Sequence, residues 1–157
     1  MDISAFIEIA KELHVLGIKI TKDGELINEW YSEEECRRNI YSAAKSFTSC
    51  AVGFAVQEGL ISLDEKLTDA FSEDLPEVID ANLQMATVRD LPTMCPGQEQ
   101  GSLMGAQRPL YKEDDWVKMA LAIPFKYKPG THFVYNNVGP YLAGILVQRR
   151  SGCDLVS

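Results

Sequence analysis

The segment from Ser42 to Glu58 constrains the fold most, because apolar residues would surround it on nearly all sides if it were a helix. The apolar side chains are those of Phe47, Cys50, Ala51, Val52, Phe54, Ala55 and Val56. A helix that is apolar on every side is typical of the interior of a domain. We therefore predict a buried central helix over residues 42–58, ended by Gly59 and with Cys50 in the core.

The remaining elements are read from periodicity and turn signals. Helical spacing is found at residues 3–12, 87–94, 113–123 and 139–150, and residues 98–108 lack helical or strand periodicity. Residues 14–20 and 25–31 are β-rich, and Lys22-Asp23-Gly24 between them is a hairpin turn signal. The sequence predicts an α+β fold in which a helical portion packs on a small antiparallel sheet, within a single domain over residues 1–157.

Composition and charge exclude several classes of function. The 157-residue chain has a formal net charge of −8, which argues against binding to nucleic acid or to an anionic membrane. The N-terminus lacks the basic start and long apolar core of a signal peptide, so we expect a cytoplasmic protein. His14 and His132 are isolated, and the four cysteines lack metal-finger spacing, so no metal and no cofactor are expected.

Ser42 and Lys45 form a Ser-x-x-Lys pair at the start of the predicted central helix. Residues three apart share a helix face, so the Lys45 amine can lie beside the Ser42 hydroxyl. A serine becomes a good nucleophile only when a neighbouring group takes its proton. The spacing therefore makes Ser42 a candidate nucleophile, although a helix N-cap is an alternative role for this serine.

Tyr135 and Asn137 form a second candidate group, because residues two apart face one way in an extended segment. Beside Lys45, the phenolate form of Tyr135 would be favoured, which would make Tyr135 a general base or proton relay for Ser42. Asn137 could donate to a substrate carbonyl or hold Lys45 in place. Taken alone, Tyr135 is better explained as a half-buried strand tyrosine.

Several linked segments, in order, resemble one family of enzymes. Residues 40–48, 57–67, 87–97 and 125–137 are together similar to the penicillin-recognising serine hydrolases, nearest to class C β-lactamases, DD-peptidases and related esterases. The resemblance implies part of the β-lactamase/transpeptidase-like fold. It also implies Ser42 as acylating nucleophile, Lys45 as its partner, Tyr135 as base or relay, and Asn137 as ligand of substrate and lysine.

The chain departs from that family in two ways. The family's third motif, a Lys- or His-x-Gly strand that supplies one donor of the oxyanion hole, is not found, and losing such a donor costs roughly 3 kcal/mol of transition-state stabilisation. Pro92 and Pro96 also stand where that family usually has apolar or small polar residues, and a proline inside a short helix, such as the one expected over residues 87–94, can break it. The resemblance therefore implies an N-terminal fragment. Its missing sheet would leave apolar surface uncovered, so we expect a homo-oligomer.

The sequence thus predicts a serine hydrolase that acts on a small-molecule ester or amide, including β-lactam-like bonds, through a Ser42 acyl-enzyme whose activity is impaired in this chain. Two alternatives remain open. The chain could be a non-catalytic member that binds a ligand or partner, or an inert structural fragment that self-associates.

Overall fold

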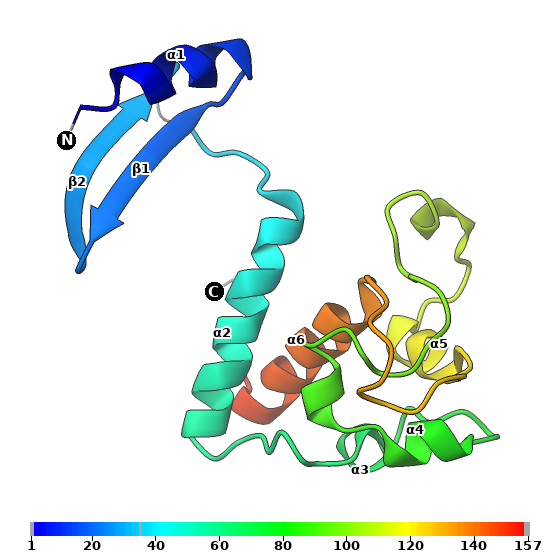
Figure 1. Cartoon of the computed structure of the whole chain (residues 1–157). Helices are drawn as coiled ribbons and strands as arrows, with labels where there is room; N and C mark the ends of the chain where they lie inside the picture. The colour runs from blue at the N-terminus through cyan, green and yellow to red at the C-terminus, as the bar shows by residue number, and fades with distance from the viewer. Residues whose placement is uncertain (1, 35, 156–157) are drawn as a thin grey trace. The chain divides into compact units, whose positions relative to one another are not determined.

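The computed structural model of the protein describes residues 2–34 and 36–155. The chain divides into two compact units, Met1–Ile40 and Tyr41–Ser157, which are considered separately below. Each unit has its own secondary structure (Figure 1). In the described ranges, no helix has the length and apolarity needed to cross a membrane.

The smaller unit is a helix followed by a two-stranded antiparallel hairpin, as the sequence predicts. Helix α1 covers Ser4–Glu12, and strands β1 and β2 cover Gly17–Lys22 and Glu25–Tyr31. The strands pair with Ile18 opposite Trp30, and the register shifts after Ile20. Asp23 and Gly24 have φ values of 54° and 85°, the left-handed pair that a tight two-residue hairpin turn requires.

The larger unit is built on two helices that lie side by side, α2 (Ala44–Gln57) and α6 (Val138–Ser151). Shorter helices complete this unit: α3 (Leu67–Ala70), α4 (Ala81–Met85) and α5 (Trp116–Ala122). Single 3-10 turns lie at Tyr41–Ala43 (η1), Val88–Asp90 (η2) and Arg108–Leu110 (η3). One apolar cluster fills the space between them and includes Leu67, Phe71, Leu83, Leu121, Leu142 and Leu146. The α+β prediction is therefore confirmed.

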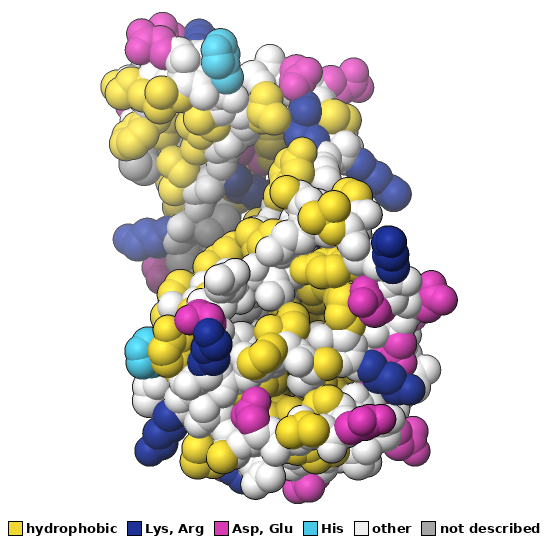
Figure 2. Space-filling view, turned by 90° about the vertical axis from the view of Figure 1, so that its right-hand side faces the viewer, with side chains coloured by type: hydrophobic (Ala, Val, Ile, Leu, Met, Phe, Trp, Pro, Cys, Tyr) yellow, Lys and Arg dark blue, Asp and Glu magenta, His cyan; other side chains and the backbone are white. Residues whose placement is uncertain are grey.

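Helix α2 is less buried than the sequence predicts. Val52 and Ala55 are its buried residues, whereas Phe47 and Phe54 are 69% and 65% exposed and Cys50 is also exposed. Apolar side chains likewise reach the surface in the space-filling view (Figure 2). The prediction of a helix buried on all sides, with Cys50 in the core, is wrong, because the larger unit supplies packing partners for one face of α2 only.

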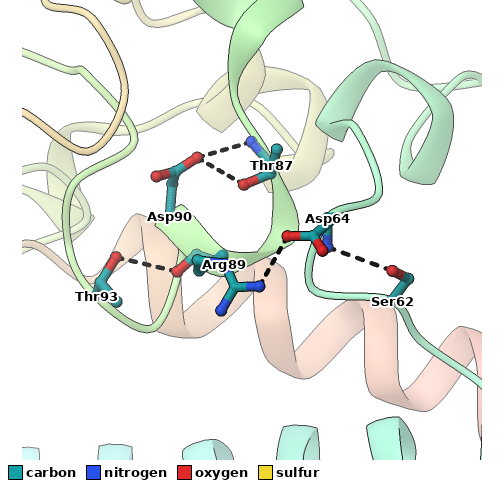
Figure 3. A network of polar contacts seen from close by, with 6 residues as sticks. All are labelled: Ser62, Asp64, Thr87, Arg89, Asp90 and Thr93. Carbon is teal, nitrogen blue, oxygen red and sulfur yellow. Dashed lines mark hydrogen bonds and ion pairs between the residues drawn. The ribbon is translucent and has the colours of Figure 1, made fainter.

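The expected helix over residues 87–94 is also wrong: only η2 forms, followed by a series of turns. Pro92 has no N–H with which to continue a helical ladder. Thr87 and Asp90 form a capping box, in which the backbone N and Oγ1 of Thr87 each donate to Asp90 Oδ2 at 2.8 Å. Arg89 donates to Asp64, in the segment between α2 and α3, at 2.7 Å, and the Thr93 hydroxyl donates to the Arg89 carbonyl (Figure 3).

Two irregular segments run beside each other and carry the second half of the candidate site. Backbone N–H groups of residues 127–137 donate to carbonyls of residues 94–102, from Tyr127 to Gly97 and from Val134 to Met94. Gly97 has φ 111°, and a Cβ there would lie 2.3 Å from the Tyr127 carbonyl oxygen. Glycine at this position therefore allows the two segments to approach.

Candidate active site

Ser42 lies in turn η1, immediately before helix α2, and its side chain is exposed. The N-cap position belongs to Ala43, and among the described residues no side chain caps the helix there. The alternative role of Ser42 as a helix cap is therefore not the one found in the structure. The residue before it, Tyr41, has φ 47°, a left-handed conformation that is uncommon for a large side chain and often found near functional sites.

Lys45, in the first turn of α2, points back to the serine. Its Nζ donates a hydrogen bond to Ser42 Oγ at 3.0 Å, and its side chain is half-buried. Behind it lies a cavity of about 30 Å³ whose walls include Thr48, Pro92 and Pro140. Pro92, which breaks the expected helix, thus contributes to the surroundings of this lysine.

Tyr135 approaches the same two residues from the irregular segment before α6. Lys45 Nζ lies 5.1 Å from the centroid of the Tyr135 ring. The pKa of the Tyr135 phenol is lowered below its usual value, chiefly by hydrogen bonding with Ser42 and to a smaller extent by hydrogen bonding with Lys45. Burial has a still smaller, opposing effect on this pKa. Tyr135 is 42% exposed and lies in an irregular segment rather than in a strand.

Asn137 is the N-cap residue of α6, and its amide is directed at a neighbouring loop. Its side-chain Nδ2 donates to the Leu103 carbonyl at 2.8 Å, and its backbone N donates to the Ser102 carbonyl at 3.0 Å. The structure therefore brings Ser42, Lys45 and Tyr135 together. The Asn137 amide, in contrast, donates to the loop that contains Leu103.

Sequence reasoning missed the residues that hold Tyr135 in place. Met94, with φ 57°, accepts the Val134 N–H at 3.0 Å, and Gly101 lies against the Tyr135 carbonyl. Asn136 is fully buried. In the sequence Asn136 is only a polar residue between two candidate site residues, and the pattern does not predict its burial.

The three converging groups can perform one chemical operation. A hydroxyl, a cation and a phenol of lowered pKa lie at one exposed point, ahead of a helix N-terminus that carries partial positive charge. Loss of the hydroxyl proton to the phenolate would produce an alkoxide beside a cation. That is the arrangement of an activated nucleophile.

Similarity to solved structures extends over nearly the whole chain. The octameric penicillin-binding protein homologue from Pyrococcus abyssi is 26% identical, with a TM-score of 0.71 over 99% of this chain and 40% of that one. SurE, solved with D-Leu, is 26% identical, with a TM-score of 0.66 over 96% of this chain and 36% of that one. The β-lactamase/D-alanine carboxypeptidase from Pseudomonas syringae shares the fold at 18% identity, with a TM-score of 0.73 over 96% and 44% of the two chains.

The chain thus spans less than half the length of each of these structures. No curated protein matches it. The sequence profile of the Beta-lactamase family matches residues 6–156, nearly the full length. Together with the shared fold, this match shows that the chain belongs to the β-lactamase family.

Proposed function

We propose that the chain carries the nucleophilic half of a serine hydrolase site and that Ser42 forms an acyl-enzyme with an ester or amide substrate. The observation that carries this proposal is the contact of Lys45 Nζ with Ser42 Oγ at 3.0 Å, with Tyr135 next to both. Membership of the β-lactamase family supports the same class of reaction.

In this proposal Tyr135 is the general base. Its phenolate takes the Ser42 hydroxyl proton, and the resulting alkoxide attacks the carbonyl carbon of the substrate. Lys45, which donates to Ser42 Oγ, stabilises the negative charge on that oxygen. The proton then passes from Tyr135 to the leaving alcohol or amine as the tetrahedral intermediate collapses. Water later hydrolyses the acyl-enzyme, again with Tyr135 as base.

Asn137 is proposed to bind substrate, but its amide first has to change partner. In the structure its Nδ2 donates to the Leu103 carbonyl, so a substrate carbonyl would have to compete with the loop for this donor. Turnover is expected to be slow, because the sequence lacks the strand motif that supplies a donor to the oxyanion in this family.

The test is the intact mass of the chain after incubation with a nitrophenyl ester or with a penicillin. We expect one acyl adduct on the native chain and none on Ser42→Ala. Ser46→Ala is the matched control, because Ser46 is an exposed α2 serine without a lysine three residues later, and it should keep the adduct. No adduct on the folded native chain, or an adduct that persists in Ser42→Ala, would contradict the proposal.

Self-association is the second part of the proposal. The exposed rings of Phe47 and Phe54 on α2 support it, because an uncovered apolar face favours association. The octameric state of the Pyrococcus abyssi homologue is in keeping with it. Light scattering after size exclusion should give a mass above 17.5 kDa that falls when both phenylalanines are replaced by serine. A monomeric native chain would exclude this part of the proposal.

A further inference from the structure

We propose that Asn136, the middle residue of Tyr135-Asn136-Asn137, is a positioning residue that holds the Tyr135 ring beside Ser42 and Lys45. This inference rests on the proposed role of Tyr135 as the general base. It gives a function to a residue whose side chain hydrogen-bonds to Val134 and Gly139 and not to the nucleophile or the lysine.

The side chain of Asn136 links the backbone before Tyr135 to the backbone that follows it. It is fully buried, with 0% of its surface exposed. Its Nδ2 donates to the Val134 carbonyl at 2.6 Å, and its Oδ1 accepts the Gly139 N–H at 2.8 Å. One amide therefore ties the residue before Tyr135 to the first turn of α6. An asparagine kept inside a protein needs such partners, because a buried amide without them is costly.

The first turn of α6, to which this bridge is attached, is buried and tightly packed. A Cβ added at Gly139 would lie 2.2 Å from the Leu91 carbonyl oxygen, so the helix begins in direct contact with the turn that contains Leu91. Gly139 and its neighbours Val138 and Leu142 are buried. Because the Asn136 amide bonds to Gly139 on one side and to Val134 on the other, it holds the backbone on both sides of Tyr135 against this turn.

Other contacts hold the same segment against residues 94–102. Val134 N donates to the Met94 carbonyl at 3.0 Å, and Asn137 N donates to the Ser102 carbonyl at 3.0 Å. Gly101 lies so close that a Cβ there would be 2.5 Å from the Tyr135 carbonyl oxygen. The segment forms no helix or strand at Tyr135, so these contacts and the Asn136 bridge replace a regular hydrogen-bond ladder.

Asparagine supplies both groups on one short side chain: an N–H donor for the Val134 carbonyl and an oxygen acceptor for the Gly139 N–H. Aspartate keeps the acceptor for Gly139 N–H but turns a negative oxygen toward the Val134 carbonyl. Serine can cap the helix through its hydroxyl, but it is too short to reach the preceding carbonyl as well. Asn136→Ser is therefore the informative variant, because it keeps the start of α6 and removes the link to Tyr135.

The experiment follows the titration of Tyr135 by NMR with ¹³Cζ-labelled tyrosine, the signal being assigned by its absence in Tyr135→Phe. In the native chain hydrogen bonding with Ser42 and Lys45 lowers the pKa of this phenol. In Asn136→Ser and Asn136→Ala we expect that pKa to move up toward the usual tyrosine value. We also expect the rate constant for acylation of Ser42 by a nitrophenyl ester to fall by about 10- to 100-fold, since misplaced catalytic groups have effects of this size.

Asn82→Ala is the matched control. Asn82 also uses its Nδ2 to hold a loop carbonyl, that of Phe125 at 2.6 Å, so its loss should lower stability to urea in a similar way. It should leave both the Tyr135 titration and the acylation rate as in the native chain. A folded Asn136→Ser chain in which Tyr135 titrates as in the native chain would overturn the proposal.

The two proposals fail separately. If the native chain forms no adduct but the Tyr135 signal shifts in Asn136→Ser, the hydrolase proposal fails and the positioning role of Asn136 stands. If the adduct forms equally fast in native and Asn136→Ser chains, with Tyr135 titrating alike in both, the positioning role fails alone.

Discussion

Helices α2 and α6 both have 14 residues and both are rich in apolar side chains, yet they differ in how much of that surface they bury. In α6 the buried residues include Val138, Leu142, Leu146 and Val147, whereas in α2 they are Val52 and Ala55. An apolar sequence therefore allows a helix to be buried on all sides. How many sides are in fact buried depends on which other segments of the protein pack against the helix. The helix that carries Lys45 is the more exposed one, and the helix that anchors Tyr135 is the more buried.

The largest expected difference is between truncations of large apolar residues on the two helices. Leu142→Ala in α6 removes a side chain that is 0% exposed and should lower the free energy of unfolding by about 2–5 kcal/mol. Phe54→Ala in α2, where the ring is 65% exposed, should cost less than about 1 kcal/mol. Urea denaturation at low protein concentration measures both. Equal losses would show that the outer face of α2 is covered in solution.

A pair of glycines sharpens the same comparison. Gly139→Ala at the start of α6 places a Cβ 2.2 Å from the Leu91 carbonyl oxygen and should cost about 1–3 kcal/mol. Gly53→Ala within α2 meets no described atom within 4 Å, so it should stabilise the chain by about 0.5–1 kcal/mol through helix propensity. Thermal unfolding of the two variants should therefore shift in opposite directions. A destabilised Gly53→Ala would contradict the open face of α2.

Ion pairs give a smaller effect. Arg149 on α6 holds Asp74, whose side chain is only 7% exposed, through hydrogen bonds at 2.5 and 3.2 Å. That bonding raises the pKa of the Arg149 guanidinium, so the guanidinium stays charged at ordinary pH. Arg149→Gln leaves the buried carboxylate short of donors and should cost about 1–3 kcal/mol.

Arg89 provides the matched control for Arg149. It pairs with Asp64 at 2.7 Å, but the two side chains are 54% and 82% exposed. Because exposed pairs contribute little, Arg89→Gln should cost less than about 1 kcal/mol. Urea denaturation of both variants, in low and in high salt, measures the two losses of unfolding free energy. A loss for Arg149→Gln that is no larger than the loss for Arg89→Gln would contradict the prediction.

The sequence predicted those features that depend on local chemistry. The hairpin turn follows from Asp23-Gly24, the return strand over residues 25–31 has the predicted bounds, and the last helix lies within two residues of its predicted range. The meeting of Ser42 and Lys45 follows from their spacing on one turn.

Most features that were not predicted depend on contacts between distant segments, as the exposed face of α2 depends on what packs against it. The failure of the helix over residues 87–94 has a local cause, Pro92, which the sequence itself shows. The support of Tyr135 by Asn136, Met94 and Gly101 comes from irregular backbone, which has no periodicity to detect. That residues 1–157 form one domain stays a prediction.

The most direct test of the proposed site is the pH dependence of Ser42 acylation by a nitrophenyl ester, followed by intact mass in the native chain and in Tyr135→Phe. The phenolate forms above the pKa of Tyr135, and hydrogen bonding with Ser42 and Lys45 lowers that pKa. We predict that the native rate rises with pH to a plateau, with a midpoint below the ordinary tyrosine pKa of about 10. We also predict that Tyr135→Phe is slower by about 10²- to 10⁴-fold and lacks this midpoint. Superimposable profiles for the two chains would contradict the account.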